Sequence, residues 1–220
     1  MYRRLLITAA QIDKAYAEKS KAERGGALHE CGRVLLAGCI DEMGIEKIPT
    51  MGKGDFGKPY FTEYPNLTFN ISHSGFAAVC AFGVNVGEIG IDLEYIERKG
   101  FPSKFERIAP RLFSEGEIDE IRGSDDSAAE FYRIWTEREA LAKYTGRGIS
   151  EILEKRHGAA KKAEESDGKI YSSVIKIGGL EYAMSLAVGE KVAESAKNIE
   201  IAGFTFIKLR KEMTSWQAEL

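Results

Sequence analysis

The chain carries one pattern of extended segments twice, and this repetition limits the possible fold more than any other feature. In the first half, the small-residue run AAVCAFG is followed by a turn and by EIGIDLE, where Ile89, Ile91 and Leu93 alternate with glycine and acidic residues. In the second half, EYAMSLAV leads to NIEIAGFTFI, whose alternation changes phase at Gly203, as at a bulge. Alternation with a period of two is typical of strands with one buried face. The order therefore indicates two similar subdomains.

Glycine and proline mark the place where these halves meet. The segment RKGFPSK, with Gly100 and Pro102, interrupts the periodic patterns. It predicts an N-terminal subdomain of residues 1–100 and a C-terminal subdomain of residues 101–220. Residues 155–169 are charged and poor in large apolar side chains, which predicts an exposed, mobile loop or a frayed helix.

Three segments have apolar patterns typical of helices. The first covers residues 13–40 and contains a glycine pair at 25–26, which predicts a separation into two helices. The second covers residues 112–121. The third covers residues 127–144 and stops before Gly146, a typical helix terminator.

The composition is that of an ordinary globular protein. The 220 residues are 44% hydrophobic, enough for a sizeable core, and the formal net charge of -3 lacks the basic excess of nucleic-acid-binding proteins. Three cysteines without C-x-x-C spacing argue against a disulfide framework or a zinc cluster and fit a reducing cytoplasm. The N-terminal apolar run is too short for a signal peptide or a membrane span. We therefore expect a cytoplasmic monomer with no nucleic-acid or membrane partner.

The segment GKGDFGKP, residues 52–59, matches all but the last position of the phosphate-binding loop G-x-x-x-x-G-K-[ST]. That last position is Pro59, which has neither a hydroxyl group for Mg²⁺ nor an N–H for a helix start, and which biases Lys58 away from helical angles. A phosphohydrolase of the P-loop class is therefore disfavoured.

Asp92 and Glu94 lie two residues apart on a predicted strand, so their carboxylates project from the same face. Two neighbouring carboxylates repel each other unless a cation lies between them. When the pair is considered alone, a solvated sheet edge is the favoured interpretation.

A stripe of residues spaced by four follows in the third helix. Phe131, Trp135, Glu139 and Lys143 share one face, which begins aromatic and ends with a glutamate–lysine pair. One interpretation is a surface ion pair of small energetic value. The other interpretation makes the carboxylates of Asp92, Glu94 and Glu139 oxygen ligands of a Mg²⁺ ion. Such an ion would also bind phosphate oxygens of a substrate. Lys143 would then neutralise a leaving phosphate.

His73 lies in SHSG, which the pattern predicts as a turn between two extended pieces. A single histidine in a turn is commonly a structural hydrogen-bonding group, and no Ser-His-Asp order surrounds it. With Ser72 and Ser74 it could also form a small anion site.

The blocks GKP, FNISHSG, GIDLE and WTEREALAKYTGRGI occur here in the order found in the two-domain 4′-phosphopantetheinyl transferases that activate peptide and polyketide synthases, and the chain resembles that family from Gly57 to about Gly148. The resemblance implies transfer of the phosphopantetheine arm of coenzyme A to a serine of an apo acyl or peptidyl carrier protein, with release of 3′,5′-ADP. It also implies an α+β fold of two similar subdomains related by a pseudo-twofold axis, with the active site at their interface.

The same resemblance implies a metal site and two catalytic groups. Asp92, Glu94 and Glu139 match the ligands of Mg²⁺, or Mn²⁺, with the pyrophosphate of coenzyme A supplying further oxygens. Glu139 is also similar to the residue that takes the proton from the carrier serine, and Lys143 to the residue that assists the departing phosphate. Arg138 stands where the family has lysine; it keeps the positive charge but does not exchange a proton near neutrality.

Further matches concern the nucleotide end of coenzyme A. Lys58 and Pro59 resemble the segment that contacts adenine, while Ser72 and His73 match residues that face the 3′-phosphate. Basic residues near that phosphate are matched by Lys21, Arg24 and Arg33.

A non-catalytic module that binds a carrier protein or coenzyme A with the same fold is the alternative of a different class. The presence of Asp92, Glu94, Glu139 and Lys143 argues against this alternative, because a module that only binds has no need of the complete set.

Overall fold

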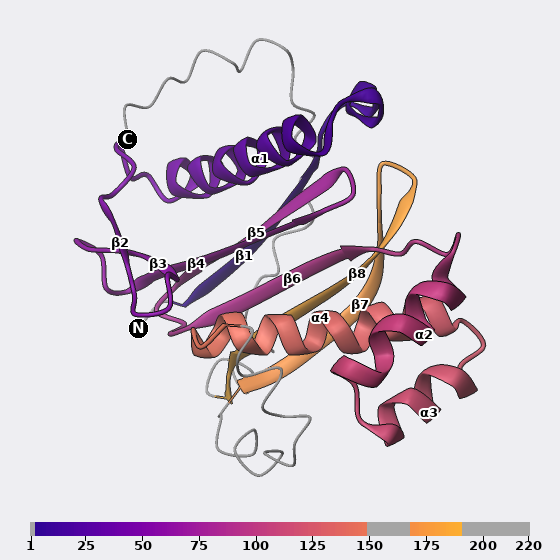
Figure 1. Ribbon diagram of the computed structural model, residues 1–220. Helices are drawn as coiled ribbons and strands as arrows, with labels where there is room; N and C mark the ends of the chain where they lie inside the picture. The colour runs from indigo at the N-terminus through magenta and orange to yellow at the C-terminus, as the bar shows by residue number, and fades with distance from the viewer. Residues whose placement is uncertain (1–2, 149–167, 191–220) are drawn as a thin grey trace.

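The computed structural model describes residues 3–148 and 168–190 (Figure 1). The strands of these residues form two three-stranded sheets and a short hairpin. The first sheet contains β1 (Arg4–Gln11), β4 (Leu67–Ser74) and β5 (Ala77–Val84), with β5 in the centre. Both pairs of neighbouring strands are antiparallel.

The second sheet has the same strand order as the first. It contains β6 (Ile89–Tyr95), β7 (Gly168–Ile177) and β8 (Leu180–Gly189), with β8 in the centre and both pairs antiparallel. In each sheet the third strand along the chain lies between the first two. The α+β class is therefore confirmed, whereas the pseudo-twofold relation stays a prediction. The boundary at residue 100 also stays a prediction, although β6 precedes it and pairs with β8.

The central core lies between the inner faces of the two sheets. Ile89, Ile91 and Leu93 of β6 are buried and pack in one cluster with Val79 of β5 and Leu186 of β8. The alternation predicted for β6 and β8 is therefore confirmed, because their large apolar residues point into this core.

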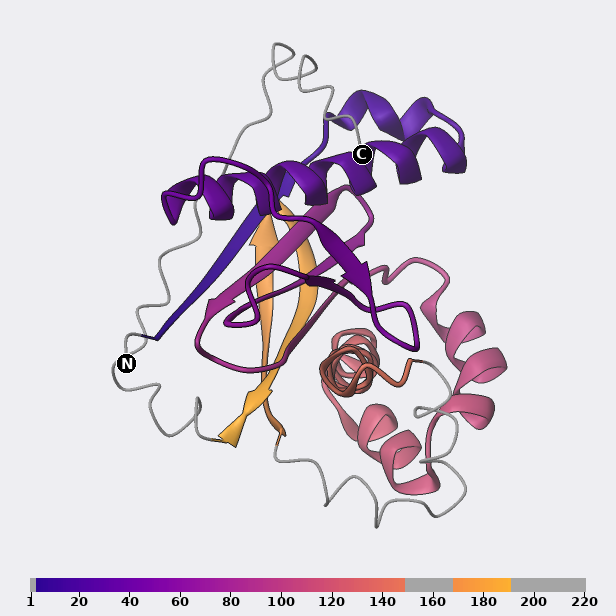
Figure 2. The same ribbon diagram turned by 90° about the vertical axis from the view of Figure 1, so that its left-hand side faces the viewer.

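Two long helices cover the outer faces. The helix α1 (Lys21–Glu42) packs on the first sheet and α4 (Ser127–Thr145) on the second, so they lie on opposite sides of the paired sheets (Figures 1 and 2). The prediction for α4 is confirmed, including its end at Gly146, which has a φ of 71°. The separation predicted at residues 25–26 is wrong, because α1 continues through the glycine pair. Packing of its apolar side on the sheet outweighs the backbone entropy of two glycines.

The connection before α4 differs from the prediction. The helix α2 (Phe101–Leu112) begins where a break was expected. Pro102 lies in the first helical turn, where backbone N–H groups have no partner within the helix, so the missing N–H of proline costs no hydrogen bond. The helix α3 (Glu115–Gly123) then starts with a capping box formed by Ser114 and Glu117. The single helix predicted over residues 112–121 is therefore wrong at its start.

Shorter elements complete the described structure. A 3₁₀ helix, η1 (Lys14–Glu18), precedes α1, and a hairpin of β2 (Met51–Lys53) and β3 (Pro59–Phe61) follows it. A strand rather than a helix thus follows Lys58, which agrees with the argument against a P-loop. The segment at residues 198–207 and most of the predicted loop at residues 155–169 lie outside the described residues. Among the described helices, none has the length and apolar character needed to cross a membrane.

Gly90 permits close contact between β6 and α4. A Cβ atom at this position would overlap the carbonyl oxygen of Ala140 and lie 2.5 Å from the backbone nitrogen of Tyr144. Across the sheet, Ala187 of β8 is paired with Gly90, so the surface beneath this part of α4 is made of small residues. This close approach brings the last turns of α4 next to the acidic face of β6.

We predict that Gly90→Ala displaces α4 from β6. The new methyl group would meet backbone atoms of α4, so this overpacking should lower the free energy of unfolding by about 1–3 kcal/mol. The displacement would also move Lys143 away from Asp92. Chemical denaturation should show reduced stability relative to the wild-type protein. Gly116→Ala is the matched control, because a Cβ at that helical position meets no atom within 4 Å. Equal stability of Gly90→Ala and the wild-type protein would contradict this role of Gly90.

Candidate active site

Side chains join β4 to β6, although the two strands belong to different sheets. Alternate residues of β4 accept hydrogen bonds from backbone N–H groups of β6. The pairs are Asn70 with Ile91, Ser72 with Leu93, and Ser74 with Tyr95. This arrangement fixes the acidic face of β6 beside the end of β4.

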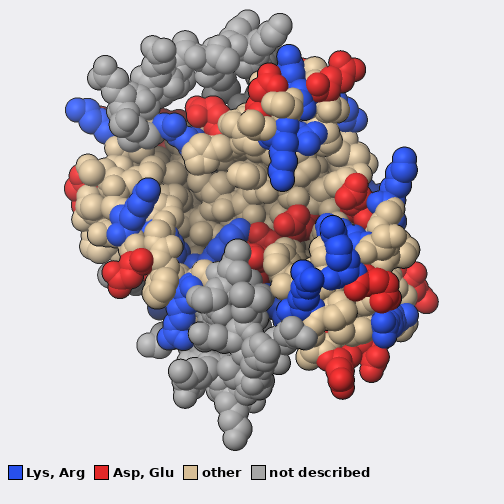
Figure 3. All heavy atoms as spheres, in the orientation of Figure 1, with Lys and Arg blue, Asp and Glu red and all other residues tan. Residues whose placement is uncertain are grey.

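A cavity of about 300 Å³ opens where β4, β6 and α4 meet. Ile71 and Trp135 line it together with six residues predicted as site residues: Ser72, His73, Asp92, Glu94, Glu139 and Lys143. Acidic side chains gather near the centre of the face shown in Figure 3, in the hollow between the parts that carry α1 and α4. The fold thus collects groups that are up to 71 residues apart in the sequence.

Asp92 is the most deeply buried carboxylate of this cavity, with only 4% of the residue exposed. Its Oδ1 atom accepts hydrogen bonds from the hydroxyl of Ser72 at 2.8 Å and from Nζ of Lys143 at 2.6 Å. Its Oδ2 atom is buried and has no hydrogen-bond partner. One oxygen of Asp92 is therefore fully engaged, and the other is available to a ligand.

The other two carboxylates are held at raised pKa values. Burial raises the pKa of Glu94 and the charge of Asp92 raises it further, while a hydrogen bond from Ser74 at 2.6 Å opposes the shift. Burial also raises the pKa of Glu139, with added repulsion from Asp92 and Glu94. Three neighbouring carboxylates in a cavity partly shielded from water form a site that favours binding of a cation.

Lys143 interacts with β4 and β6 rather than forming an isolated helix-surface pair. Its Nζ atom donates to Asp92 at 2.6 Å, to the carbonyl oxygen of Ile91 at 3.1 Å and to the hydroxyl of Ser72 at 3.0 Å. Its side chain is 27% exposed, so the ammonium group is partly removed from water. Lys143 therefore balances the charge of Asp92.

His73 lies within β4, so the turn predicted at residues 72–75 begins too early. The strand continues to Ser74, and Gly75, with a φ of 59°, makes the tight connection to β5.

Loss of surrounding water lowers the pKa of the His73 ring, and the neighbouring charge of His29 lowers it further. His29 of α1 was not predicted as a neighbour of the site; its position one helical turn before Arg33 was the available signal.

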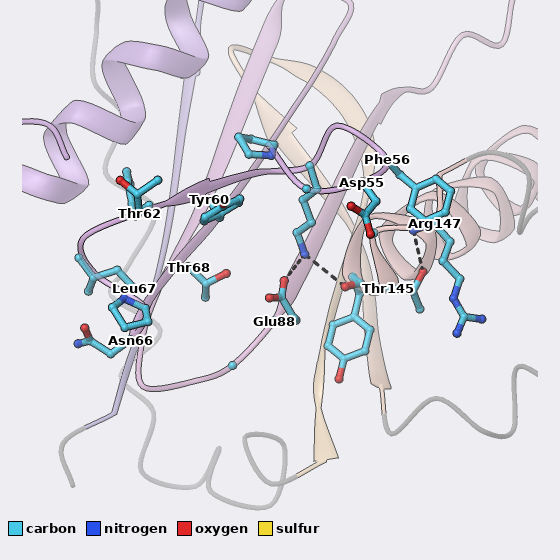
Figure 4. A pocket seen from close by; sticks show the side chains of 18 of the residues that line it. Asp55, Phe56, Tyr60, Thr62, Asn66, Leu67, Thr68, Glu88, Thr145 and Arg147 are labelled. Carbon is cyan, nitrogen blue, oxygen red and sulfur yellow. Dashed lines mark hydrogen bonds and ion pairs between the residues drawn. The ribbon is translucent and has the colours of Figure 1, made fainter. Parts of the chain in front are cut away.

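Lys58 and Pro59 line a second, larger cavity of about 890 Å³ beside the β2–β3 hairpin (Figure 4). The ammonium group of Lys58 donates to Glu88, to the carbonyl oxygen of Ile89 at 3.0 Å and to that of Tyr144 at 3.2 Å. These contacts tie the hairpin to the start of β6 and the end of α4. The structure thus separates Lys58 and Pro59 from the cavity that holds the carboxylates.

The three basic residues expected near a phosphate lie on α1. Lys21 is exposed in the first turn, Arg24 lies 5.7 Å from the centre of the Phe76 ring, and Arg33 forms an ion pair of 3.6 Å with Glu30. The lining of neither cavity includes them.

Asp92, Glu94 and Glu139 offer oxygen atoms of the type that Mg²⁺ prefers. In the described part of the chain, no three histidine, cysteine, aspartate or glutamate side chains form a group that could hold a metal ion as they stand. Two observations nevertheless fit a cation at this place. A cation would give the unpartnered Oδ2 of Asp92 a partner. It would also reduce the repulsion between carboxylates that contributes to the raised pKa values of Glu94 and Glu139.

Comparison with known proteins points to one family. The family model for the 4′-phosphopantetheinyl transferase superfamily matches residues 88–185, which contain β6 and α4. The chain is similar to a 4′-phosphopantetheinyl transferase of Bacillus subtilis, with 36% identity over 50% of this chain and 46% of the relative. It is also similar to the transferase AcpT of Salmonella typhimurium, with 31% identity over 67% of this chain and 73% of the relative, and to the transferase Sfp of Bacillus subtilis, with 32% identity over 60% of each chain.

The chain belongs to the 4′-phosphopantetheinyl transferase superfamily. Enzymes of this family transfer phosphopantetheine from coenzyme A to carrier proteins, and the resemblance of the sequence to the two-domain type is confirmed. The alignment spans about half the length of the first Bacillus subtilis relative.

We predict that loss of Lys143 destabilises the protein through Asp92. Lys143→Ala leaves a buried carboxylate without its cation, which costs about 3 kcal/mol, the lower end of the range for buried pairs because Lys143 is 27% exposed. Adding Asp92→Asn removes the uncompensated charge and should restore part of the loss. Denaturant unfolding of both single variants and the double variant measures this coupling. Additive losses would show that the two side chains do not interact.

Proposed function

We propose that this protein transfers the 4′-phosphopantetheine group of coenzyme A to a serine hydroxyl of an apo acyl or peptidyl carrier protein and releases 3′,5′-ADP. The observation that supports this most is the convergence of Asp92, Glu94, Glu139 and Lys143 on one cavity. Three carboxylates beside one ammonium group suit a substrate with two linked phosphates, provided that a divalent cation reduces the repulsion between them.

Asp92, Glu94 and Glu139 would hold Mg²⁺, which Mn²⁺ could replace. The buried Oδ2 of Asp92 supports this assignment, since a buried carboxylate oxygen without a partner is otherwise costly. When bound, the ion would supply positive charge to the phosphate oxygens of coenzyme A during transfer.

Glu139 is proposed to accept the proton of the carrier serine. Its raised pKa supports this role, because a carboxylate whose pKa lies closer to neutrality accepts a proton more readily than an ordinary glutamate. The reaction forms a bond between the serine oxygen and the β-phosphorus of coenzyme A and breaks the bond to the α-phosphate oxygen. Lys143 would compensate the negative charge on the departing 3′,5′-ADP.

His73 and the basic side chains of α1, Lys21, Arg24 and Arg33, are proposed to face the 3′-phosphate of coenzyme A. The place of His73 in the lining of the cavity that holds the carboxylates supports this role, since an imidazole N–H can donate a hydrogen bond to a phosphate oxygen. The segment of Lys58 and Pro59 is proposed to contact the adenine end through the hairpin.

The shared strand order of the two sheets supports a pseudo-twofold relation between two subdomains, with the active site at their interface. We further propose that the enzyme acts as a monomer in the cytoplasm, with an apo carrier protein as its macromolecular partner.

We predict that incubation with coenzyme A and Mg²⁺ adds phosphopantetheine to an apo carrier protein. Intact-protein mass spectrometry should detect the added group, and excess chelator should abolish its transfer, because the pyrophosphate and three carboxylates repel one another without a cation. Added Mg²⁺ or Mn²⁺ should restore it. A carrier that binds tightly but stays unmodified would indicate the non-catalytic module instead.

We predict that His73→Ala weakens the use of coenzyme A without slowing the chemical step. A contact to the 3′-phosphate contributes equally to the ground and transition states, so KM should rise while kcat changes little. Dephospho-coenzyme A lacks this phosphate, and the penalty of the substitution should shrink with it. The same penalty with both substrates would place His73 away from the 3′-phosphate.

A further inference from the structure

Strands β4 and β6 run side by side in the same direction, and their register is constant along the site. The N–H groups of Ile91, Leu93 and Tyr95 bond to side chains that are each 21 residues earlier in the chain. Because side chains alternate along a strand, the three acceptors, Asn70, Ser72 and Ser74, all point toward β6. Side chains thus replace the backbone ladder that would join neighbouring strands of one sheet.

The two serines of this series each make a second hydrogen bond, to a carboxylate. Ser72 donates from Oγ to Oδ1 of Asp92 at 2.8 Å, and Ser74 donates to Oε2 of Glu94 at 2.6 Å. Each serine therefore connects a backbone N–H of β6 with the carboxylate that precedes it. One oxygen of each carboxylate is fixed, and the other is left for a ligand.

The hydroxyl of Ser72 has no remaining hydrogen-bonding capacity. A hydroxyl group has one donor and two acceptor positions. Ser72 uses the donor for Asp92 and accepts from the N–H of Leu93 at 3.3 Å and from Nζ of Lys143 at 3.0 Å. Its proton is therefore engaged with Asp92, while the 3′-phosphate contact expected from the sequence stays a prediction.

We propose that Ser72 and Ser74 are positioning residues that set the orientation of Asp92 and Glu94 toward the divalent cation. This inference rests on the proposed metal-dependent function. By holding Oδ1 of Asp92, Ser72 leaves the unpartnered Oδ2 as the oxygen for the cation. Ser74 acts on Glu94 in the same way. Hydrogen bonds to metal-ligating groups orient them and change metal affinity.

Asn70 provides a matched control for this proposal. It accepts the N–H of Ile91 in the same series, and it is 6% exposed, close to the 7% of Ser72. The cavity lining does not include it. Asn70→Ala thus removes one of the three bonds between the strands but neither serine–carboxylate bond. Ser173→Ala, on the exposed strand β7, controls for the loss of a hydroxyl alone.

The experiment measures Mn²⁺ binding to the full chain with coenzyme A and without a carrier protein, following free Mn²⁺ by electron paramagnetic resonance. Ser72→Ala and Ser74→Ala should weaken Mn²⁺ binding by about 10–100-fold, the usual effect of removing a group that orients a metal ligand. Asn70→Ala should lower the melting temperature and keep the wild-type Mn²⁺ affinity. High Mg²⁺ concentrations should restore part of the turnover lost in Ser74→Ala.

Cysteine variants keep the proposal testable if an alanine variant does not fold. A thiol leaves no cavity in place of the hydroxyl but is a weak hydrogen-bond donor, so Ser72→Cys and Ser74→Cys should fold and still lose Mn²⁺ affinity. Wild-type affinity in the folded serine variants would overturn the positioning role alone. No Mn²⁺ binding by the wild-type protein with coenzyme A would instead overturn the proposed metal site, and this inference with it.

Discussion

The buried charge of Asp92 is the constraint on which the site depends. A carboxylate that is 4% exposed is stable only with a nearby cation and hydrogen-bond donors, and Lys143 and Ser72 supply both. These partners come from α4 and β4, so the charge can be satisfied only when both elements lie against β6. The stability of the fold and the geometry of the site are therefore coupled through one side chain.

Small residues make this arrangement possible. The face of the second sheet beneath α4 pairs Gly90 with Ala187, and Ser185 of β8 lies opposite Asp92. Ser185 is fully buried and shares a hydrogen bond of 2.7 Å with Thr136 of α4. Because this surface carries few large side chains, the helix lies close enough for a lysine to reach across it. The small residues thus set the position of α4, as well as filling the core.

The junction between β4 and β6 explains how a site can form between two sheets. A continuous backbone ladder would use the N–H groups of β6 and leave the side chains of β4 without a role at this edge. Here alternate side chains of β4 accept those N–H groups, and two of them also hold carboxylates. The joint between the sheets and the support of the acidic residues are therefore the same set of hydrogen bonds.

The sequence by itself determined the strands with clear alternation, the helix that ends at Gly146, and the identity of the carboxylates, because period and residue type are local properties. It did not reveal β1, whose apolar run lacks alternation because both faces are buried. It also could not show that Lys143 pairs with Asp92, 51 residues away, or that the hydroxyl of Ser72 is saturated. Those facts depend on which faces pack together, and only the tertiary structure decides that.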